Sequence, residues 1–190
     1  MKKTFLILAS CLFYFGSQAQ VKVGADKSFT KSLNDYSTYA WSKNIDQIPS
    51  DKIYIAPNGV YIFNNESVRS KIKAAIEYEL SAKGYKKVDN NPDILVLFTV
   101  TEQPGKLRTY NGYQMIDNGL DSVRTPSDVE TTPIDAGTLI INLLDAQSGV
   151  VAWQGYASGI LKPDMINDET KVREAVSSIF DQFKFTAKKQ

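Results

Sequence analysis

The chain has 190 residues, of which 43% are hydrophobic and 23% are charged. This composition is typical of one ordinary globular domain, and a chain of this length can bury a real core. The 22 basic residues nearly balance the 21 acidic ones. The net charge therefore gives no electrostatic reason to expect nucleic acid or an anionic membrane surface as a partner.

The N-terminus has the three-part pattern of a secretory signal peptide. Lysines at positions 2 and 3 precede an apolar run over residues 5–15, which is too short to cross a bilayer as a helix. Residues 17–19, Ser-Gln-Ala, then fit the small-x-small rule for cleavage. We therefore predict a signal peptide over residues 1–19 and a single exported domain over residues 20–190. The expected location is the periplasm or the outer membrane.

A competing interpretation concerns Cys11. Residues 8–11, Leu-Ala-Ser-Cys, resemble the lipobox of bacterial lipoproteins, in which the cysteine becomes the lipidated first residue. Few residues precede Cys11, however, and residues 12–15 remain apolar where a lipoprotein has a polar tether. We favour cleavage after Ala19. Under the alternative the chain is a lipid-anchored structural envelope protein, which contacts the membrane only if Cys11 is lipidated.

The inventory of reactive side chains excludes several chemistries. Cys11 is the one cysteine and the sequence has no histidine, so a chain cleaved after Ala19 contains neither. Ser-His-Asp and Cys-His catalysis, a His/Cys zinc site and a disulfide are then impossible. No Gly-rich phosphate loop is present either. We expect a protein that is not an enzyme and that has no cofactor and no metal.

The first half of the mature chain predicts two strands and a helix. Alternation over residues 20–26 indicates an edge strand, and the β-forming residues 36–41 indicate a second strand. A helix is expected from Asn64 or Asn65 to about Lys83. Its apolar stripe comprises Val68, Ile72, Ala75, Ile76 and Leu80. The charged residues expected on the opposite, solvated face are Arg69, Lys73 and Glu77.

The centre of the sheet is expected in the second half. Residues 94–101 begin with apolar residues on both faces, which is typical of a central strand. Residues 138–145 and 150–159 predict an antiparallel hairpin. Leu139, Ile141 and Leu143 lie on one face of its first strand. Asn142 lies on the second face, which we expect to be half covered.

A second amphipathic helix is expected to follow a cap at Asn167 or Asp168. The tail over residues 184–190 is expected to be frayed. Two helices and about five strands predict an α+β fold, a two-layer sandwich. A mainly antiparallel or mixed sheet then carries both helices on one face. The buried stripe of the second helix comprises Val172, Ala175, Val176, Ile179, Phe180 and Phe183.

The segment over residues 102–137 is long, polar and interrupted by prolines and glycines. Because structureless segments of this length are unusual in a compact domain, we expect one or two edge strands, over residues 107–115 and 128–132, with a mobile turn between them. Its arginines and tyrosines are candidates for partner binding, since these residue types are enriched at binding hot spots. The alternative is that they only shield the second sheet face. The candidates are Arg108, Tyr110, Tyr113 and Arg124.

Two other groups of side chains have a functional and a structural interpretation. Carboxylate catalysis needs acids that converge in a cleft, and the sequence does not show convergence, so we expect solvated surface acids. The aromatic residues are expected to pack in the core rather than to form a binding platform. The acids are Asp117, Asp121, Asp164, Asp168 and Glu169, and the aromatic residues are Tyr39, Trp41, Trp153 and Tyr156.

Five segments, in this order and spacing, resemble a bacterial envelope family, the domain of unknown function 4136: residues 36–41, 83–85, 91–96, 137–141 and 151–157. The resemblance implies a secreted or lipid-anchored envelope domain with no assigned activity, and it brings no catalytic residues. The end of the signal is similar to those of Bacteroidetes-type bacteria. We expect a non-catalytic module that binds an unknown envelope protein or ligand. The alternative is a carboxylate-based hydrolase that acts on envelope glycans or peptides.

Overall fold

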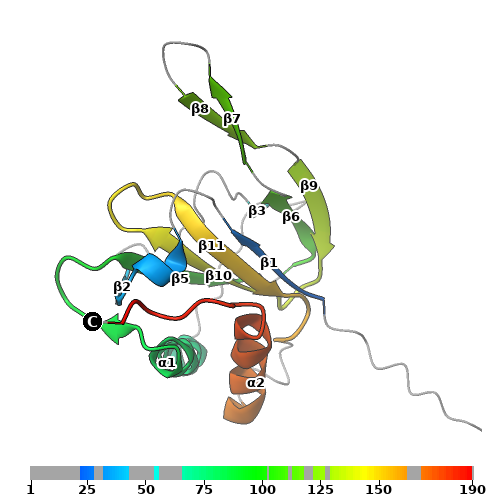
Figure 1. Cartoon of the computed structure of the whole chain (residues 1–190). Coiled ribbons are helices and arrows are strands. Elements are labelled where there is room, and N and C mark those ends of the chain that lie inside the picture. Colours follow the sequence, from blue (N-terminus) through cyan, green and yellow to red (C-terminus); the bar gives the residue numbers. More distant parts are fainter. Residues whose placement is uncertain are drawn as a thin grey trace, which may run out of the picture.

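The computed structural model describes residues 22–27, 32–42, 54–55, 66–101, 103–110, 113–117, 122–126, 129–161 and 168–189. The predicted signal peptide, Cys11 and the candidate caps Asn64, Asn65 and Asn167 lie outside these residues. The described residues form two α-helices, α1 (Glu66–Ala82) and α2 (Glu169–Phe180), a short 3-10 helix (Leu33–Asp35) and three sheets. Figure 1 shows both helices on one face of the largest sheet, so the predicted α+β sandwich is confirmed.

The largest sheet has six strands in the order β1-β11-β10-β5-β2-β4, one more than expected. It is mixed, because β2 runs parallel to β4 and β5 while the other pairs are antiparallel. The predicted edge strand and the two predicted central strands are all confirmed. The bounds are β1 (Val23–Lys27), β2 (Thr38–Trp41), β4 (Lys86–Lys87), β5 (Ile94–Val100), β10 (Leu139–Asp145) and β11 (Val151–Ala157).

The predicted hairpin is the centre of this sheet. β10 pairs with β11 on one side and with β5 on the other. At the turn, Asp145 Oδ1 accepts hydrogen bonds from the backbone N–H groups of Gln147 (3.0 Å) and Ser148 (2.7 Å). Gly149 then takes φ +70°, a conformation that a side chain would disfavour. The aspartate and the glycine therefore stabilise the two ends of the turn.

The face of the sheet toward the helices is apolar throughout. Every predicted stripe residue of α1 and α2 is buried there. Trp153 of β11 lies with its ring centroid 5.8 Å from Phe180 and 5.0 Å from Phe183. A Cβ atom added to Gly155 would lie 2.2 Å from the Trp153 ring. Glycine at this position therefore makes room for the tryptophan under α2.

The C-terminal tail differs from its prediction. α2 ends at Phe180, so Phe183 packs into the core from the segment after the helix and not from the helix itself. The tail is also held by the body rather than frayed. The backbone N–H groups of Ala187 and Lys188 donate to the carbonyl groups of Lys83 (2.9 Å) and Tyr36 (2.8 Å). These long-range bonds fix the tail between the end of α1 and the segment that precedes β2.

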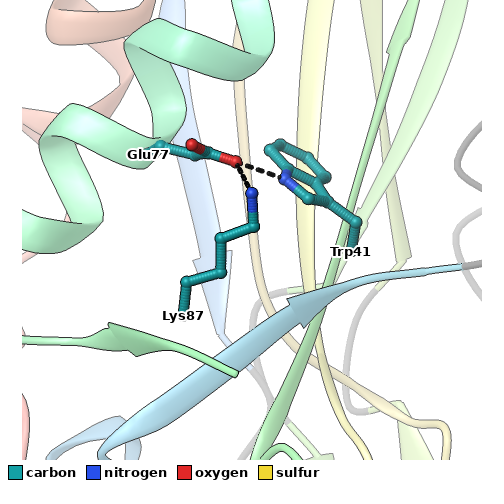
Figure 2. A network of polar contacts seen from close by, with 3 residues as sticks. All are labelled: Trp41, Glu77 and Lys87. Carbon is teal, nitrogen blue, oxygen red and sulfur yellow. Dashed lines mark hydrogen bonds and ion pairs between the residues drawn. The ribbon is translucent and has the colours of Figure 1, made fainter. Parts of the chain in front are cut away.

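The predicted solvated face of α1 is wrong for the side of the helix next to the sheet. Arg69 is buried, and its guanidinium carbon lies 5.3 Å from the ring centroid of Phe98. Figure 2 shows Glu77 Oε1 accepting hydrogen bonds from Trp41 Nε1 (2.7 Å) and Lys87 Nζ (2.5 Å). Long charged side chains can cover aromatic surface with their stems while the charged ends stay paired, so this side of α1 packs on the sheet.

The second face of the main sheet is fully covered only at its centre, because Leu95 and Leu144 on the same face are half-buried. Asn142 and Gln154 have no exposed area. Beside them, Leu107 and Ile134 pack against Ile140 and Tyr156 in a small second core. Leu107 and Ile134 belong to a three-stranded sheet formed by β3 (Tyr54–Ile55), β6 (Gly105–Tyr110) and β9 (Val129–Ile134). The predicted burial of Tyr39, Trp153 and Tyr156 is confirmed, and Trp41 is half-buried.

The long polar segment contains more strand than expected. β6 pairs with β9, and β7 (Tyr113–Asp117) pairs with β8 (Ser122–Pro126). The register is the same in both ladders. The last pair of the first ladder is Tyr110↔Val129, and the first pair of the second ladder, Tyr113↔Pro126, lies three residues further along each strand. The two ladders are therefore two parts of one long hairpin, which we call the arm. In Figure 1 its β7–β8 end extends away from the main sheet and the helices.

Candidate functional site

The structure places all four predicted binding residues on the arm. Arg108 and Tyr110 lie in β6, opposite Thr131 and Val129. Tyr113 begins β7 opposite Pro126, and Arg124 of β8 is paired with Met115. Two of the four therefore lie in the part next to the body and two in the part that extends from it. The sequence did not reveal that two ladders in one register would bring residues 108 and 124 onto the same element.

The two halves of the arm are supported differently. At its base, Leu107 and Ile134 are buried against the main sheet. The β7–β8 ladder is a two-stranded sheet of its own. An isolated two-stranded hairpin is at best marginally stable in water, so the distal half depends on its anchored base or on contact with another surface.

A second candidate site is a pocket of about 430 Å³ at one end of the main sheet. Asp145 pairs with Ile94 in the register of β10 and β5, so the end of one strand and the start of the other bring Asp145 and Asp93 to the same pocket. Tyr36 lies with them, and its hydroxyl donates to Asp145 Oδ2 at 2.5 Å. The remaining lining residues are Asn91, Pro92, Ala146 and Gln147.

Both carboxylates of this pocket are strongly engaged. Asp93 Oδ2 accepts hydrogen bonds from the backbone N–H and hydroxyl groups of Ser37 (2.9 and 3.2 Å) and Thr38 (3.0 and 2.9 Å). Burial opposes the charge on Asp93 and on Asp145, but these bonds, and those from Tyr36 and Ser148 to Asp145, outweigh it and lower the pKa of both groups. Burial, and then the bond to Asp145, raises the pKa of Tyr36.

The pocket can hold negative charge but is poorly suited to general acid catalysis. A carboxyl group that donates a proton near neutral pH needs a raised pKa, and both shifts here are in the opposite direction. Asp93 and Asp145 are not among the acids that the sequence brought forward as candidates. The available signal was their position, since one precedes a predicted central strand and the other ends its neighbour.

Of the acids named from the sequence, two lie at the start of α2 and one lies at the end of β7. Asp168 caps α2, and its Oδ1 accepts from the backbone N–H groups of Thr170 (2.9 Å) and Lys171 (3.4 Å). Glu169 is the first residue of α2, and Asp117 ends β7. Asp121 and Asp164 lie outside the description. Asp168 therefore has a structural role, which confirms one of the two predicted caps.

A buried polar cluster lies on the second face of the main sheet. Gln154 Nε2 donates to Asn142 Oδ1 at 2.8 Å, between neighbouring strands. Asn142 Nδ2, Gln154 Oε1 and the hydroxyl of Thr99 are buried without a hydrogen-bond partner. Exchanging the two amide orientations would still leave one donor and one acceptor unpaired. Each such atom costs about 1–3 kcal/mol, so this face is less well satisfied than the face toward the helices.

In the part of the chain that the structure describes, no group of three or more His, Cys, Asp or Glu side chains is arranged to hold a metal ion. None of the helices found there has the length and apolar character needed to cross a membrane.

Comparison with known proteins gives a family and a fold. No curated protein matches the chain. Among solved structures, a DUF4136 family protein from Bacteroides thetaiotaomicron is 17% identical and has a TM-score of 0.51, covering 86% of this chain and 95% of that one. A PDZ domain protein from Parabacteroides distasonis is 18% identical with a TM-score of 0.46, covering 88% of this chain and 37% of that one.

A third solved structure, the PelC dodecamer from Paraburkholderia phytofirmans, is 8% identical with a TM-score of 0.44, covering 87% of this chain and 98% of that one. The model of the family described as a domain of unknown function, DUF4136, matches residues 21–183. This match spans nearly the whole predicted mature chain, in agreement with the five segments that the sequence brought together. The protein therefore belongs to the DUF4136 family.

Proposed function

We propose that this protein is an exported cell-envelope domain that binds a partner without catalysis, and that the arm makes the contact. The observation that carries the proposal is the single register shared by the two ladders of the arm. The shared register joins the strands of the long polar segment into one element. In Figure 1 the β7–β8 end of this element reaches beyond the body.

The composition of the arm supports a binding role. Tyrosine and arginine are over-represented among residues that dominate binding energy, and Arg108, Tyr110, Tyr113 and Arg124 occupy both halves of the arm. A two-stranded ladder also gains stability when another surface covers it. A partner that packs on the β7–β8 end would supply that cover.

Export is the second part of the proposal. The lysines at positions 2 and 3, the apolar run over residues 5–15 and the cleavage pattern at residues 17–19 support it. Intact-mass and N-terminal analysis of protein from the envelope fraction tests it. The expected product begins at Gln20. A product that begins at a lipidated Cys11 would instead make the chain a lipid-anchored envelope protein.

The arm is tested by substitution and capture. A variant with Arg108, Tyr110 and Tyr113 replaced by alanine should lose partner capture from an envelope extract while its melting temperature hardly changes. The matched control replaces Thr109 and Gln114, neighbours on the same two strands, and should retain capture. A triple variant that loses stability but captures normally when folded would show that these residues only support the sheet.

One observation favours the alternative of a carboxylate-based hydrolase. The pocket at the end of the main sheet is concave and holds two acids with shifted pKa values, and paired carboxylates in a cleft are what glycoside hydrolysis uses. Turnover of envelope glycans or peptides that disappears in Asp93→Asn and in Asp145→Asn, with the fold intact, would support this alternative over the binding module.

A further inference from the structure

A groove of about 310 Å³ between the two helices is independent of both sites described above. α1 contributes Ala75, Tyr78 and Glu79, which are spaced i, i+3, i+4. Residues with this spacing lie along one side of a helix. The residues from α2 have the matching spacing i, i+3, i+4, i+7, and they are Thr170, Arg173, Glu174 and Ser177.

Tyr78 gives the groove an accessible aromatic surface. The side chain is 63% exposed, and it is the one exposed large hydrophobic side chain among those whose burial the structure describes. The guanidinium carbon of Arg173 lies 5.5 Å from the centroid of its ring. This contact holds the arginine beside the tyrosine, so a planar apolar surface and a planar array of donors are presented together.

The other polar side chains of the groove have unused hydrogen-bonding capacity. Within the described part of the chain, the side chains of Glu79, Thr170, Glu174 and Ser177 make no hydrogen bond or ion pair with protein groups. Together with Arg173 they provide guanidinium donors, carboxylate acceptors and two hydroxyl groups that can do either. A ligand that fits the groove can thus bond to it without breaking existing contacts.

The charges select the class of ligand. An anion would lie close to two carboxylates, and a cation would compete with Arg173 for the ring of Tyr78. A neutral molecule avoids both costs. Sugar rings combine an apolar face of C–H groups, which suits an aromatic surface, with hydroxyl groups that both donate and accept. We propose that this groove binds a neutral oligosaccharide, with one sugar ring against Tyr78 and hydroxyl groups bonded to Arg173 and the carboxylates.

The test is titration of the isotope-labelled protein with three neutral hexasaccharides, maltohexaose, cellohexaose and the hexamer of N-acetylglucosamine, followed by NMR. At least one should bind with a dissociation constant of about 10 mM or tighter and shift the signals of the groove residues. Tyr78→Ala should weaken that binding about fivefold, since an aromatic contact contributes of the order of 1 kcal/mol. Tyr78→Phe keeps the ring and should bind nearly as well as the unmodified protein.

Three outcomes would overturn the assignment: no binding by any of the three sugars, binding that Tyr78→Ala leaves unchanged, or binding confined to charged comparators such as polygalacturonate and chitosan hexamer. Because Tyr78 is exposed, the alanine variant is expected to fold, and circular dichroism verifies this. The arm variant with Arg108, Tyr110 and Tyr113 replaced by alanine should bind the sugar normally, and Tyr78→Ala should capture the arm's partner normally. Failure of one proposal therefore leaves the other intact.

Discussion

The two faces of the main sheet are formed by the same central strands but are held in opposite ways. Toward the helices, β10 presents Leu139, Ile141 and Leu143, all fully buried in one continuous apolar core. Toward the small sheet, the same strand presents Asn142 between Ile140 and Leu144, and Asn142 is bonded to Gln154. The first face is closed by aromatic and aliphatic packing, whereas the second contains polar atoms without partners.

The difference indicates that the two faces contribute unequally to the stability of the fold. Apolar burial contributes about 25 cal/mol per Å², and it depends on close packing. Unpaired buried polar atoms subtract from stability. The face toward the helices is therefore expected to determine whether the chain folds. The second face, on which the arm is anchored through Leu107 and Ile134, is expected to hold its cover less tightly.

The largest effect is expected from truncation on the helix side. Ile141→Ala and Leu143→Ala should each lower the free energy of unfolding by about 2–5 kcal/mol, because both side chains are fully buried and their removal leaves a cavity. Urea denaturation followed by circular dichroism measures this loss. A loss below about 0.5 kcal/mol at both positions would be a surface value and would contradict the contrast between the faces.

On the second face, one substitution at Gln154 should destabilise the protein more than substitutions at Gln154 and Asn142 together. Gln154→Leu removes the partner of a buried amide at Asn142 and should cost about 1–3 kcal/mol. Adding Asn142→Leu removes the amide that has lost its partner, so the double variant should recover most of the lost free energy of unfolding. Each variant is compared in the same urea denaturation. Costs that simply add would show that the two side chains contribute through packing and not through their mutual bond.

Most of the body could be predicted from the sequence because its elements have strong periodicity. The stripe from Val68 to Leu80 and the alternation around Ile141 each allow one buried face. The charged side of α1 could not be placed in this way, because Arg69 and Glu77 are covered by contacts with Phe98 and Trp41 from distant strands. Helical spacing alone does not show such long-range partners.

The sites were harder to predict than the fold for the same reason. The candidate residues of the arm were found by residue type, but the single register that joins residues 105–117 to 122–134 is a property of pairing between strands. Asp93 and Asp145 are 52 positions apart in sequence and meet through the alignment of β5 with β10. The groove at Tyr78 depends on how two helices pack, which neither helix specifies by itself.

A smaller effect is expected at the end of the sheet, where it should depend on pH. The pKa of Asp93 and of Asp145 is lowered in the folded protein. Their contribution to the free energy of unfolding is therefore present above 3.8, the pKa in the unfolded chain, and is lost as the pH falls through the pKa in the folded protein. The pKa of Tyr39 is shifted in the opposite direction. Burial raises its pKa to about 12, so stability is lost as the pH rises from 10.0, the ordinary value, through that value.

Asp145→Asn tests how much of the pH dependence of stability below neutral pH comes from Asp145. The variant should be less stable than the unmodified protein by about 1–2 kcal/mol near neutral pH, because the charged acceptor of the Tyr36 hydroxyl and of the turn is lost. The difference should shrink as the pH falls from 3.8 through the lower pKa of Asp145 in the folded protein, where its carboxylate becomes protonated. Asp89→Asn, at an exposed position, is the matched control. A difference that is constant with pH would assign the effect to shape rather than charge.

The smallest effect is expected at the rim of the helix side, where the apolar face meets solvent. Burial opposes the charge on Glu77, but the hydrogen bonds from Lys87 and Trp41 lower its pKa. The side chains of Glu77 and Lys87 are 34% and 50% exposed, and solvent screens such a pair. Lys87→Ala should therefore change the free energy of unfolding by less than about 1 kcal/mol, and less still at high salt.

Trp41→Phe completes the test at this rim. It keeps an aromatic ring near Phe98, whose centroid lies 6.1 Å from that of Trp41, but it removes the N–H group that donates to Glu77. Because Trp41 is half-buried, this change should exceed that of Lys87→Ala and should depend little on salt. If the salt dependence of the two variants is equal, the ion pair and the indole bond act as one unit. In that case the rim is held by charge, and the helix side is less purely apolar than its core indicates.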